Sequence, residues 1–241
     1  MLDEELFDVE AEQPQLSEAA LLALKKQRDI IPPEVLLLAM NGFLLVYAFS
    51  IETIYAMFMK DNFGYGHATL STLFAVNGVL VGFLQLVLMR HLVAKMGKHM
   101  LLASGNLLLA LGMLGLSLVR YTPLHFLLFS VHILGYSMAD TALVSLISRY
   151  AGSNAQGRSL GLNQAAQSTA RVISPLVAGY LYTNSKKLAE GLPPGALPYV
   201  VGSVMPLLAI AAPLILYMGS IDRKKRAAAL ESLNHNGEQP L

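Results

Sequence analysis

The sequence predicts an all-α membrane protein, a bundle of six transmembrane helices. The chain is 54% hydrophobic and only 14% charged, whereas soluble domains carry about 25% charged residues. Its mean hydropathy is +0.52. Six apolar runs follow one another along the chain, and each is long enough to cross the ~30 Å hydrocarbon core as a helix. A packed helical bundle within a bilayer is therefore the expected architecture.

The six runs are separated by short polar stretches that hold turn residues. Thr122 and Pro123 open the fourth run as N-cap and first helical residue. Pro206 and Pro213 should bend the sixth run, and membrane helices tolerate such prolines. The runs cover residues 34–59, 69–89, 100–119, 124–148, 159–182 and 198–218.

Polar segments flank the apolar region and define three parts of the chain. Residues 1–33 form a polar, acidic segment, 34–219 form the six-helix bundle, and 220–241 form a basic and polar tail. In the first segment Ser17 could cap a short helix, Glu18 to Arg28, that the Pro32-Pro33 pair would end. A solvated tail without a helix explains the same composition, so both interpretations stay open.

The distribution of lysine and arginine predicts the orientation of the spans. If the runs cross the membrane alternately, twelve of these residues fall on one side and four on the other. By the positive-inside rule both termini are then cytoplasmic, in a multi-pass protein. The sequence does not specify which membrane holds it. The twelve are Lys25, Lys26, Arg28, Arg90, Lys95, Lys98, Arg149, Arg158, Arg223, Lys224, Lys225 and Arg226, and the four are Lys60, Arg120, Lys186 and Lys187.

Several classes of function are disfavoured by what the sequence lacks. A net charge of +1 without a basic and aromatic array argues against nucleic acid as a partner. With no cysteine, thiolate metal sites and cysteine nucleophiles are excluded. The six histidines show no metal-ligand spacing, and the common hydrolase and nucleotide-binding motifs are absent. We therefore expect no enzyme activity, no metal and no cofactor.

Glycine pairs one helical turn apart predict close contacts between helices. Small residues at this spacing let two helix backbones approach each other within a membrane. The pairs are Gly78 and Gly82, Gly112 and Gly115, and Gly157 and Gly161.

The fifth run is the most polar of the six and carries an arginine near its middle. Gln164, Gln167, Arg171 and Ser174 follow at helical spacing and share one face. A cation at mid-membrane costs about 3 kcal/mol on insertion scales, so it should face a protein interior or a watery cavity. Two interpretations stay open: a structural ion pair packed between helices, or the face of a binding site or pathway.

Two acids lie within other runs at similar depth. Counted along the helices at 1.5 Å per residue, Asp140 lies ~6 Å and Glu52 ~8 Å from Arg171 in depth. A charge-pair partner for the arginine is expected, but the sequence does not say which acid supplies it. Intramembrane carboxylates also commonly carry the proton in coupled transport.

Three amides extend the predicted substrate and proton pathway. Asn41 lies three turns before Glu52 on the same face, and Gln85 shares the face of the Gly78 and Gly82 pair. Asn77 is a further amide within the second run. Taken alone, an amide within a membrane span more often forms a hydrogen bond between helices than a contact to a ligand.

A short basic turn joins the second and third runs. Residues 90–99, RHLVAKMGKH, resemble the cytoplasmic loop motif G-x-L-A-D-R-x-G-R-K of the major facilitator superfamily. Leu92, Lys95, Gly97 and Lys98 match in register, whereas Arg90 and Ala94 depart from the motif. Gly97 would permit the tight turn, and the resemblance implies a gating role for Arg90, Lys95, Gly97 and Lys98. Ordinary positive-inside anchoring is the alternative for the lysines.

The fifth run also resembles a helix of this superfamily. Ala170, Arg171, Pro175, Gly179 and the Leu181-Tyr182 pair fit the pattern aR-x-x-GP…G-x-L-Y of the eleventh helix in drug-exporter members, including tetracycline-resistance-like carriers. Ser174 stands where that pattern has glycine. The resemblance implies the C-terminal six-helix half of a transporter of small organic solutes, by proton-coupled efflux (antiport).

The resemblance also implies partners. Facilitator transporters consist of two six-helix halves with the substrate between them. The expected partners are therefore the lipid bilayer, a small organic solute, a proton, and either an N-terminal transporter half or a second copy of this chain. The alternative is a truncated membrane protein that does not transport and acts as a scaffold or interaction partner.

Overall fold

The computed structural model describes residues 31–237, except for the side chains of Asn154, Lys224 and 227–237. Within this part of the chain the long segments are all helical, and there is no strand. This confirms the predicted all-α class. The expected short helix from Glu18 to Arg28, with most of the polar segment 1–33, lies outside the described residues.

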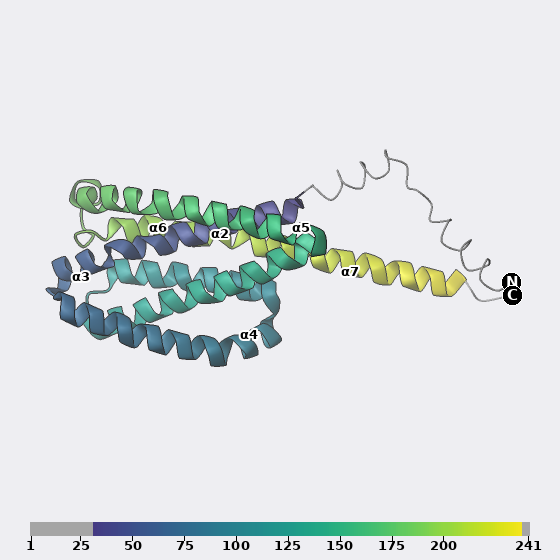
Figure 1. Ribbon diagram of the computed structural model, residues 1–241, viewed down its shortest axis with the longest axis horizontal. Coiled ribbons are helices and arrows are strands. Elements are labelled where there is room, and N and C mark those ends of the chain that lie inside the picture. Colours follow the sequence, from purple (N-terminus) through teal and green to yellow (C-terminus); the bar gives the residue numbers. More distant parts are fainter. Residues whose placement is uncertain (1–30, 238–241) are drawn as a thin grey trace, which may run out of the picture.

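The helices lie side by side in an elongated bundle, and the last part of α7 projects from one end (Figure 1). In chain order the elements are α2 (Pro33–Phe49), the 3-10 helix η1 (Ser50–Ile54), α3 (Tyr55–Phe63), α4 (His67–Leu118), α5 (Thr122–Leu188), α6 (Leu197–Ala209) and α7 (Ala211–Gly237).

The two longest helices each double back on themselves at a glycine, as Figure 1 shows for α4 and α5. Gly97 (φ 75°, ψ 162°) divides α4 into a first arm, 67–96, and a second arm, 98–118. Gly152 (φ 66°, ψ 178°) divides α5 into a first arm, 122–151, and a second arm, 153–188. These dihedrals lie in a region that only glycine adopts without strain. The prediction of a tight turn at Gly97 is confirmed.

The six predicted spans correspond to six stretches of the bundle. Pro33–Phe63, His67–Leu118, Thr122–Ser153 and Leu197–Arg223 are long and apolar enough to cross a membrane. The second of these comprises both arms of α4. The second arm of α5 is long enough but more polar, since it holds the glutamines and Arg171. The last helix continues to Gly237, so no break falls at the predicted boundary between 219 and 220.

Glycines bring the second arm of α4 and the first arm of α5 into close contact. A Cβ atom on Gly105 would lie 2.6 Å from the backbone nitrogen of Ala139, and one on Gly112 would lie 2.9 Å from Cα of His132. A Cβ on Gly115 would lie 2.8 Å from the side chain of Leu128. The predicted contact role of the Gly112 and Gly115 pair is therefore confirmed.

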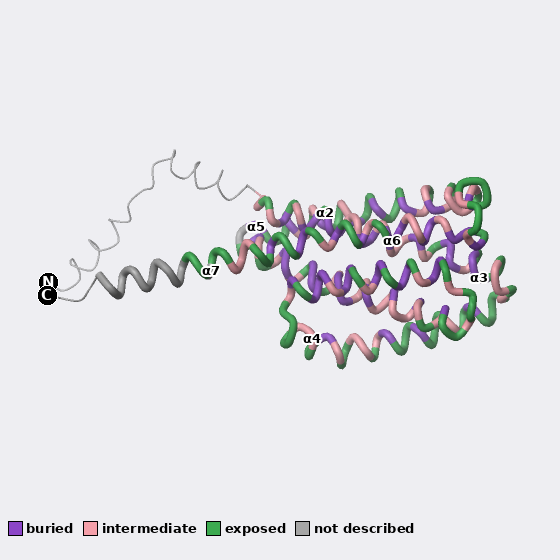
Figure 2. Tube along the Cα trace, turned by 180° about the vertical axis from the view of Figure 1, so that it is seen from behind, coloured by how far each residue is buried: buried purple, intermediate pink, exposed green. Residues whose placement is uncertain are grey.

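The same prediction is wrong for the other two glycine pairs. Added Cβ atoms on Gly78, Gly82, Gly157 and Gly161 would meet no atom within 4 Å. The first arm of α4 contacts the bundle along a narrow stripe only, and most of its remaining surface is exposed (Figure 2). The buried residues of that stripe are Leu70, Asn77, Val81 and Met89.

The end of the bundle remote from Gly97 is packed with aromatic rings. The rings of Tyr55 and Phe129 are stacked at a centroid distance of 4.2 Å. His125 connects them to the backbone, since its Nε2 lies 3.2 Å from the carbonyl oxygen of Leu116. Its Nδ1 lies 3.2 Å from the Tyr55 hydroxyl. A carbonyl can only accept, so Nε2 carries the hydrogen and Nδ1 accepts from the tyrosine.

The sixth span bends where the sequence predicted, between α6 and α7. Pro213 has no N–H group, so it cannot donate to the carbonyl of Ala209 four residues earlier. The side chain of Asn41 supplies that hydrogen bond, with Nδ2 2.6 Å from the Ala209 oxygen. Asn41 is 1% exposed, so water does not reach the pair. The amide thus satisfies a carbonyl that the proline leaves without a donor.

Replacing Asn41 by leucine should therefore destabilise the bundle, and replacing Pro213 by alanine should remove most of that effect. Asn41→Leu leaves the Ala209 carbonyl unpaired, at a cost of about 1–2 kcal/mol. In Asn41→Leu/Pro213→Ala the alanine N–H can donate to the same carbonyl. Thermal unfolding of the four proteins in detergent measures this coupling. Equal destabilisation by Asn41→Leu with and without Pro213 would contradict it.

Candidate functional site

The first span is interrupted near its middle by the 3-10 helix η1. Glu52 lies within this interruption and is half-buried. A 3-10 stretch changes the hydrogen-bonding register of a helix and often marks a hinge or a functional site. Just before it, the carbonyl of Tyr47 accepts a hydrogen bond of 2.6 Å from Oγ of Ser174 on the second arm of α5. The acid and its helix break thus lie close to the most polar span.

Tyr136, on the first arm of α5, connects the charged residues. Its hydroxyl interacts electrostatically with the Arg171 guanidinium and with the carboxyl groups of Asp140 and Glu52. Its ring stacks on Phe49 at a centroid distance of 3.8 Å. We call Glu52, Tyr136, Asp140, Gln167 and Arg171 the polar cluster. It draws on three of the six spans.

The sequence did not single out Tyr136. It precedes Asp140 by four residues and therefore shares its helical face. That spacing was the available signal, but an aromatic residue in an apolar run is more commonly part of the core.

The second arm of α5 does not present its polar residues on one common surface. Gln167 is buried, and its Nε2 donates to Oδ1 of Asp140 over 3.1 Å. Ser174 is also buried, whereas Gln164 and Arg171 are exposed. The predicted polar face is therefore only partly buried against the rest of the bundle. Its buried residues, Gln167 and Ser174, attach the second arm of α5 to its neighbours, and its exposed residues include Arg171.

Neither acid forms an ion pair with Arg171. In the part of the chain that the structure describes, the ion pair recorded is between Arg223 and Glu34, far along the chain from the cluster. The expected acid partner is thus replaced by the neutral hydroxyl of Tyr136. Similar depth along the helix axes does not bring two side chains together, because their lateral positions in the bundle decide whether they meet.

The three predicted amides lie elsewhere. Asn41 is engaged with the backbone of α6. Asn77 is buried on the first arm of α4, and its Oδ1 has no hydrogen-bond partner among the described residues. Gln85 is half-buried on the same arm. No hydrogen bond within the described residues joins either of these two to the polar cluster.

A sequence profile described as "Major Facilitator Superfamily" matches residues 36–237, which is most of the chain. The chain belongs to the major facilitator superfamily. Its members are membrane transporters rather than enzymes. No curated protein matches the chain.

In this superfamily member the basic turn is joined to a second turn. His99, two residues after Gly97, lies with its Nε2 2.9 Å from the hydroxyl of Tyr150, two residues before Gly152. Arg90 and Lys95 are exposed, and Lys98 is half-buried. The two turns are therefore connected by His99 and Tyr150 and not by the motif lysines Lys95 and Lys98.

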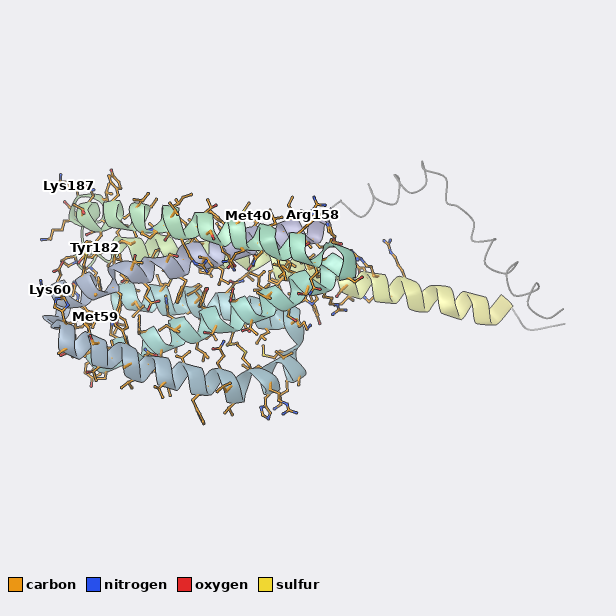
Figure 3. All side chains as sticks on the ribbon, in the orientation of Figure 1. Met40, Met59, Lys60, Arg158, Tyr182 and Lys187 are labelled. Carbon is orange, nitrogen blue, oxygen red and sulfur yellow. The ribbon has the colours of Figure 1, made fainter. Side chains whose placement is uncertain are left out.

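The ends of the bundle carry the charges that the sequence grouped together. Figure 3 places Lys60 and Lys187 at one end and Arg158 towards the other. At the first of these ends, the hydroxyl of Tyr182 donates to Oδ2 of Asp61 over 2.6 Å and connects α3 to α5.

Among the residues that the structure describes, no group of three or more histidine, aspartate and glutamate side chains is arranged to hold a metal ion.

Replacing Gly97 by alanine should destabilise the protein through backbone strain alone. A Cβ atom there would meet nothing within 4 Å, but φ at 75° is unfavourable for alanine. The expected cost is about 1–3 kcal/mol, measured by thermal unfolding in detergent. Gly78→Ala is the matched control, since Gly78 is equally open but helical, and alanine should be neutral or stabilising there. Equal melting temperatures for the two variants would rule out a strained turn at Gly97.

Proposed function

We propose that the chain takes part in secondary active transport of small organic solutes, by proton-coupled efflux (antiport). In this proposal the polar cluster contributes the solute and proton pathway. The observation that supports it best is Arg171, which is exposed near the middle of a span while the rest of its cluster is half-buried or buried.

An exposed arginine at this depth requires a polar environment. Its free energy of insertion into hydrocarbon is unfavourable by about 3 kcal/mol. Gln164 and Ser168, which precede Arg171 at helical spacing on the same arm, are polar and exposed too. Val172 and Leu176, on the neighbouring sides of the helix, are exposed and apolar. The polar stripe of Gln164, Ser168 and Arg171 suits the wall of an aqueous cavity, and the apolar residues beside it suit contact with lipid or with another helix.

This surface therefore needs a second unit opposite it. We propose that an N-terminal six-helix unit, or a second copy of this chain, covers it and leaves the cavity between the two. The chain then acts as the C-terminal half of the carrier. Arrangement of two units around a central site allows alternating access by rocking of one against the other.

The two acids have different surroundings, which suggests different roles. Asp140 holds Gln167 and so positions the second arm of α5. The carboxyl group of Glu52 has no hydrogen bond within the described residues, and the residue lies in the helix break. In our proposal Glu52 exchanges the coupled proton, Asp140 positions the second arm of α5, and Arg171 attracts the charged form of a substrate or carboxylate.

The subgroup and the orientation belong to the same proposal. The Ala170-Arg171, Pro175 and Leu181-Tyr182 pattern supports a drug-exporter-type carrier, and the excess of basic residues at the Gly97 end supports cytoplasmic termini. Lipid, a small organic solute and protons are then the partners of the chain.

Arg171→Ala should abolish most of the transport while leaving the protein in the membrane. The test is proton-driven movement of tetracycline, followed by its fluorescence, in inverted vesicles that contain the carrier. We expect at least about a tenfold loss, equivalent to about 1.4 kcal/mol of lost transition-state stabilisation. Arg171→Lys should recover activity only in part, because an ammonium group cannot reproduce the planar guanidinium.

Arg120→Ala is the matched control, since Arg120 is exposed but lies outside the polar cluster. Transport at the wild-type rate in Arg171→Ala would contradict the pathway role. Absence of proton-driven tetracycline movement in the wild type would contradict efflux of the tetracycline type.

A further inference from the structure

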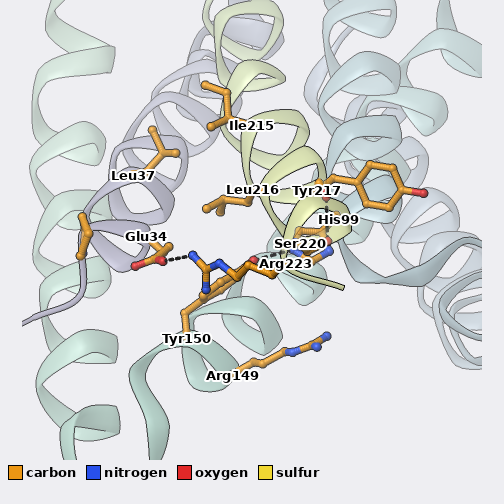
Figure 4. A pocket seen from close by; sticks show the side chains of 12 residues that line it. Glu34, Leu37, His99, Arg149, Tyr150, Ile215, Leu216, Tyr217, Ser220 and Arg223 are labelled. Carbon is orange, nitrogen blue, oxygen red and sulfur yellow. Dashed lines mark hydrogen bonds and ion pairs between the residues drawn. The ribbon is translucent and has the colours of Figure 1, made fainter. Parts of the chain in front are cut away.

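A second site lies at the Gly97 end of the bundle, where the turns and the last helix meet. It is a cavity of about 690 Å³, and none of its lining residues belongs to the polar cluster. Four elements contribute to its lining (Figure 4). The polar side chains are Glu34 from α2, His99 from α4, Arg149 and Tyr150 from α5, and Ser220 and Arg223 from α7.

The polar side of this cavity has an excess of positive charge. Arg223 is paired with Glu34, with Nη2 2.8 Å from Oε1, and His99 is hydrogen-bonded to Tyr150. Arg149 is exposed, and no hydrogen bond or ion pair engages it within the described residues. The guanidinium of Arg149 is therefore unpaired, and the Arg223 side chain, although bound to Glu34, is 72% exposed and open to a further acceptor. Two such groups suit a phosphate, which accepts paired hydrogen bonds from guanidinium.

The opposite side of the cavity is apolar. Leu37 lines it from α2, and Ile215 and Leu216 line it from α7. Ile215 is 52% exposed, so this wall continues onto the outer surface of the bundle. A free inorganic anion would leave such a wall in contact with water. A ligand with a phosphate head and an apolar chain would cover both parts.

The position of the cavity agrees with this chemistry. Most of its polar lining residues lie at the ends of three apolar spans, Pro33–Phe63, Thr122–Ser153 and Leu197–Arg223, where the head groups of a surrounding bilayer are expected. Basic pockets between helices at that depth are sites at which anionic lipids bind. We propose that the cavity binds the head group of an anionic phospholipid, with its phosphate between Arg149 and Arg223 and an acyl chain along Leu37 and Ile215.

The bound lipid would connect α5 to α7 and α2 at the end where the glycine turns lie. It would thereby hold the two turns and the last helix together. This role does not depend on the identity of the transported solute or on the polar cluster.

Native mass spectrometry of the purified full chain in detergent tests the proposal. The probes are dioleoylphosphatidylglycerol, dioleoylphosphatidylcholine and glycerol 3-phosphate. We expect phosphatidylglycerol to bind preferentially, and Arg149→Gln to weaken its binding about tenfold, the effect of losing a charge-assisted contact to phosphate. Arg149→Lys should lose less, since it keeps the charge.

Arg226→Gln is the matched control. Arg226 is an exposed arginine one turn beyond Arg223 and does not line the cavity, so its loss should leave binding unchanged. Equal binding of the two lipids, or an equal effect of both glutamine variants, would overturn the proposal. Binding of glycerol 3-phosphate as tightly as phosphatidylglycerol would show a site for soluble phosphate esters and overturn the lipid assignment.

Discussion

The bundle depends on one constraint: inside a bilayer, the protein itself has to satisfy every backbone hydrogen bond. At two breaks inside the bundle a side chain donates a hydrogen bond to the backbone. Asn41 donates to the carbonyl that Pro213 leaves free, and Ser174 donates to the carbonyl of Tyr47 just before η1. The two glycine turns, by contrast, occur at the end of the bundle, where the backbone can meet water. A side chain thus supplies a hydrogen bond at these two interior breaks, whereas water can do so at the two glycine turns.

This constraint also explains how the polar cluster is assembled. The Ser174 and Gln167 hydrogen bonds fasten the second arm of α5 to α2 and to the first arm of α5. Because Gln167 and Ser174 are fixed by these bonds, Arg171, which lies between them in sequence, is held beside Tyr136 at the border between buried and exposed surface. The same interactions that stabilise the fold therefore leave the side chain of Arg171 exposed near the middle of its span. That exposed charge is the basis of the transport proposal.

The sequence could predict the features that depend on local pattern. Hydropathy located the six spans, the facilitator motif located the turn at Gly97, and proline chemistry located the bend in the last span. Features that depend on which helix faces which were not predictable. Gly112 and Gly78 look equivalent in sequence, yet only Gly112 meets a neighbouring helix. Likewise Arg171 could be matched to two acids by depth, but its neighbour is the hydroxyl of Tyr136 because lateral position is set by tertiary packing.

The central claim is that the exposed side of the polar cluster faces water within the membrane. Since the chain has no cysteine, a single cysteine reports on one position without background. Ser168→Cys lies beside the cluster, and Val79→Cys lies on the exposed apolar surface of α4, where Val79 is 76% exposed. A membrane-impermeant methanethiosulfonate reagent, which needs water to form the reactive thiolate, should modify the first cysteine and spare the second. Protection of Ser168→Cys, or equal modification of both, would contradict the account.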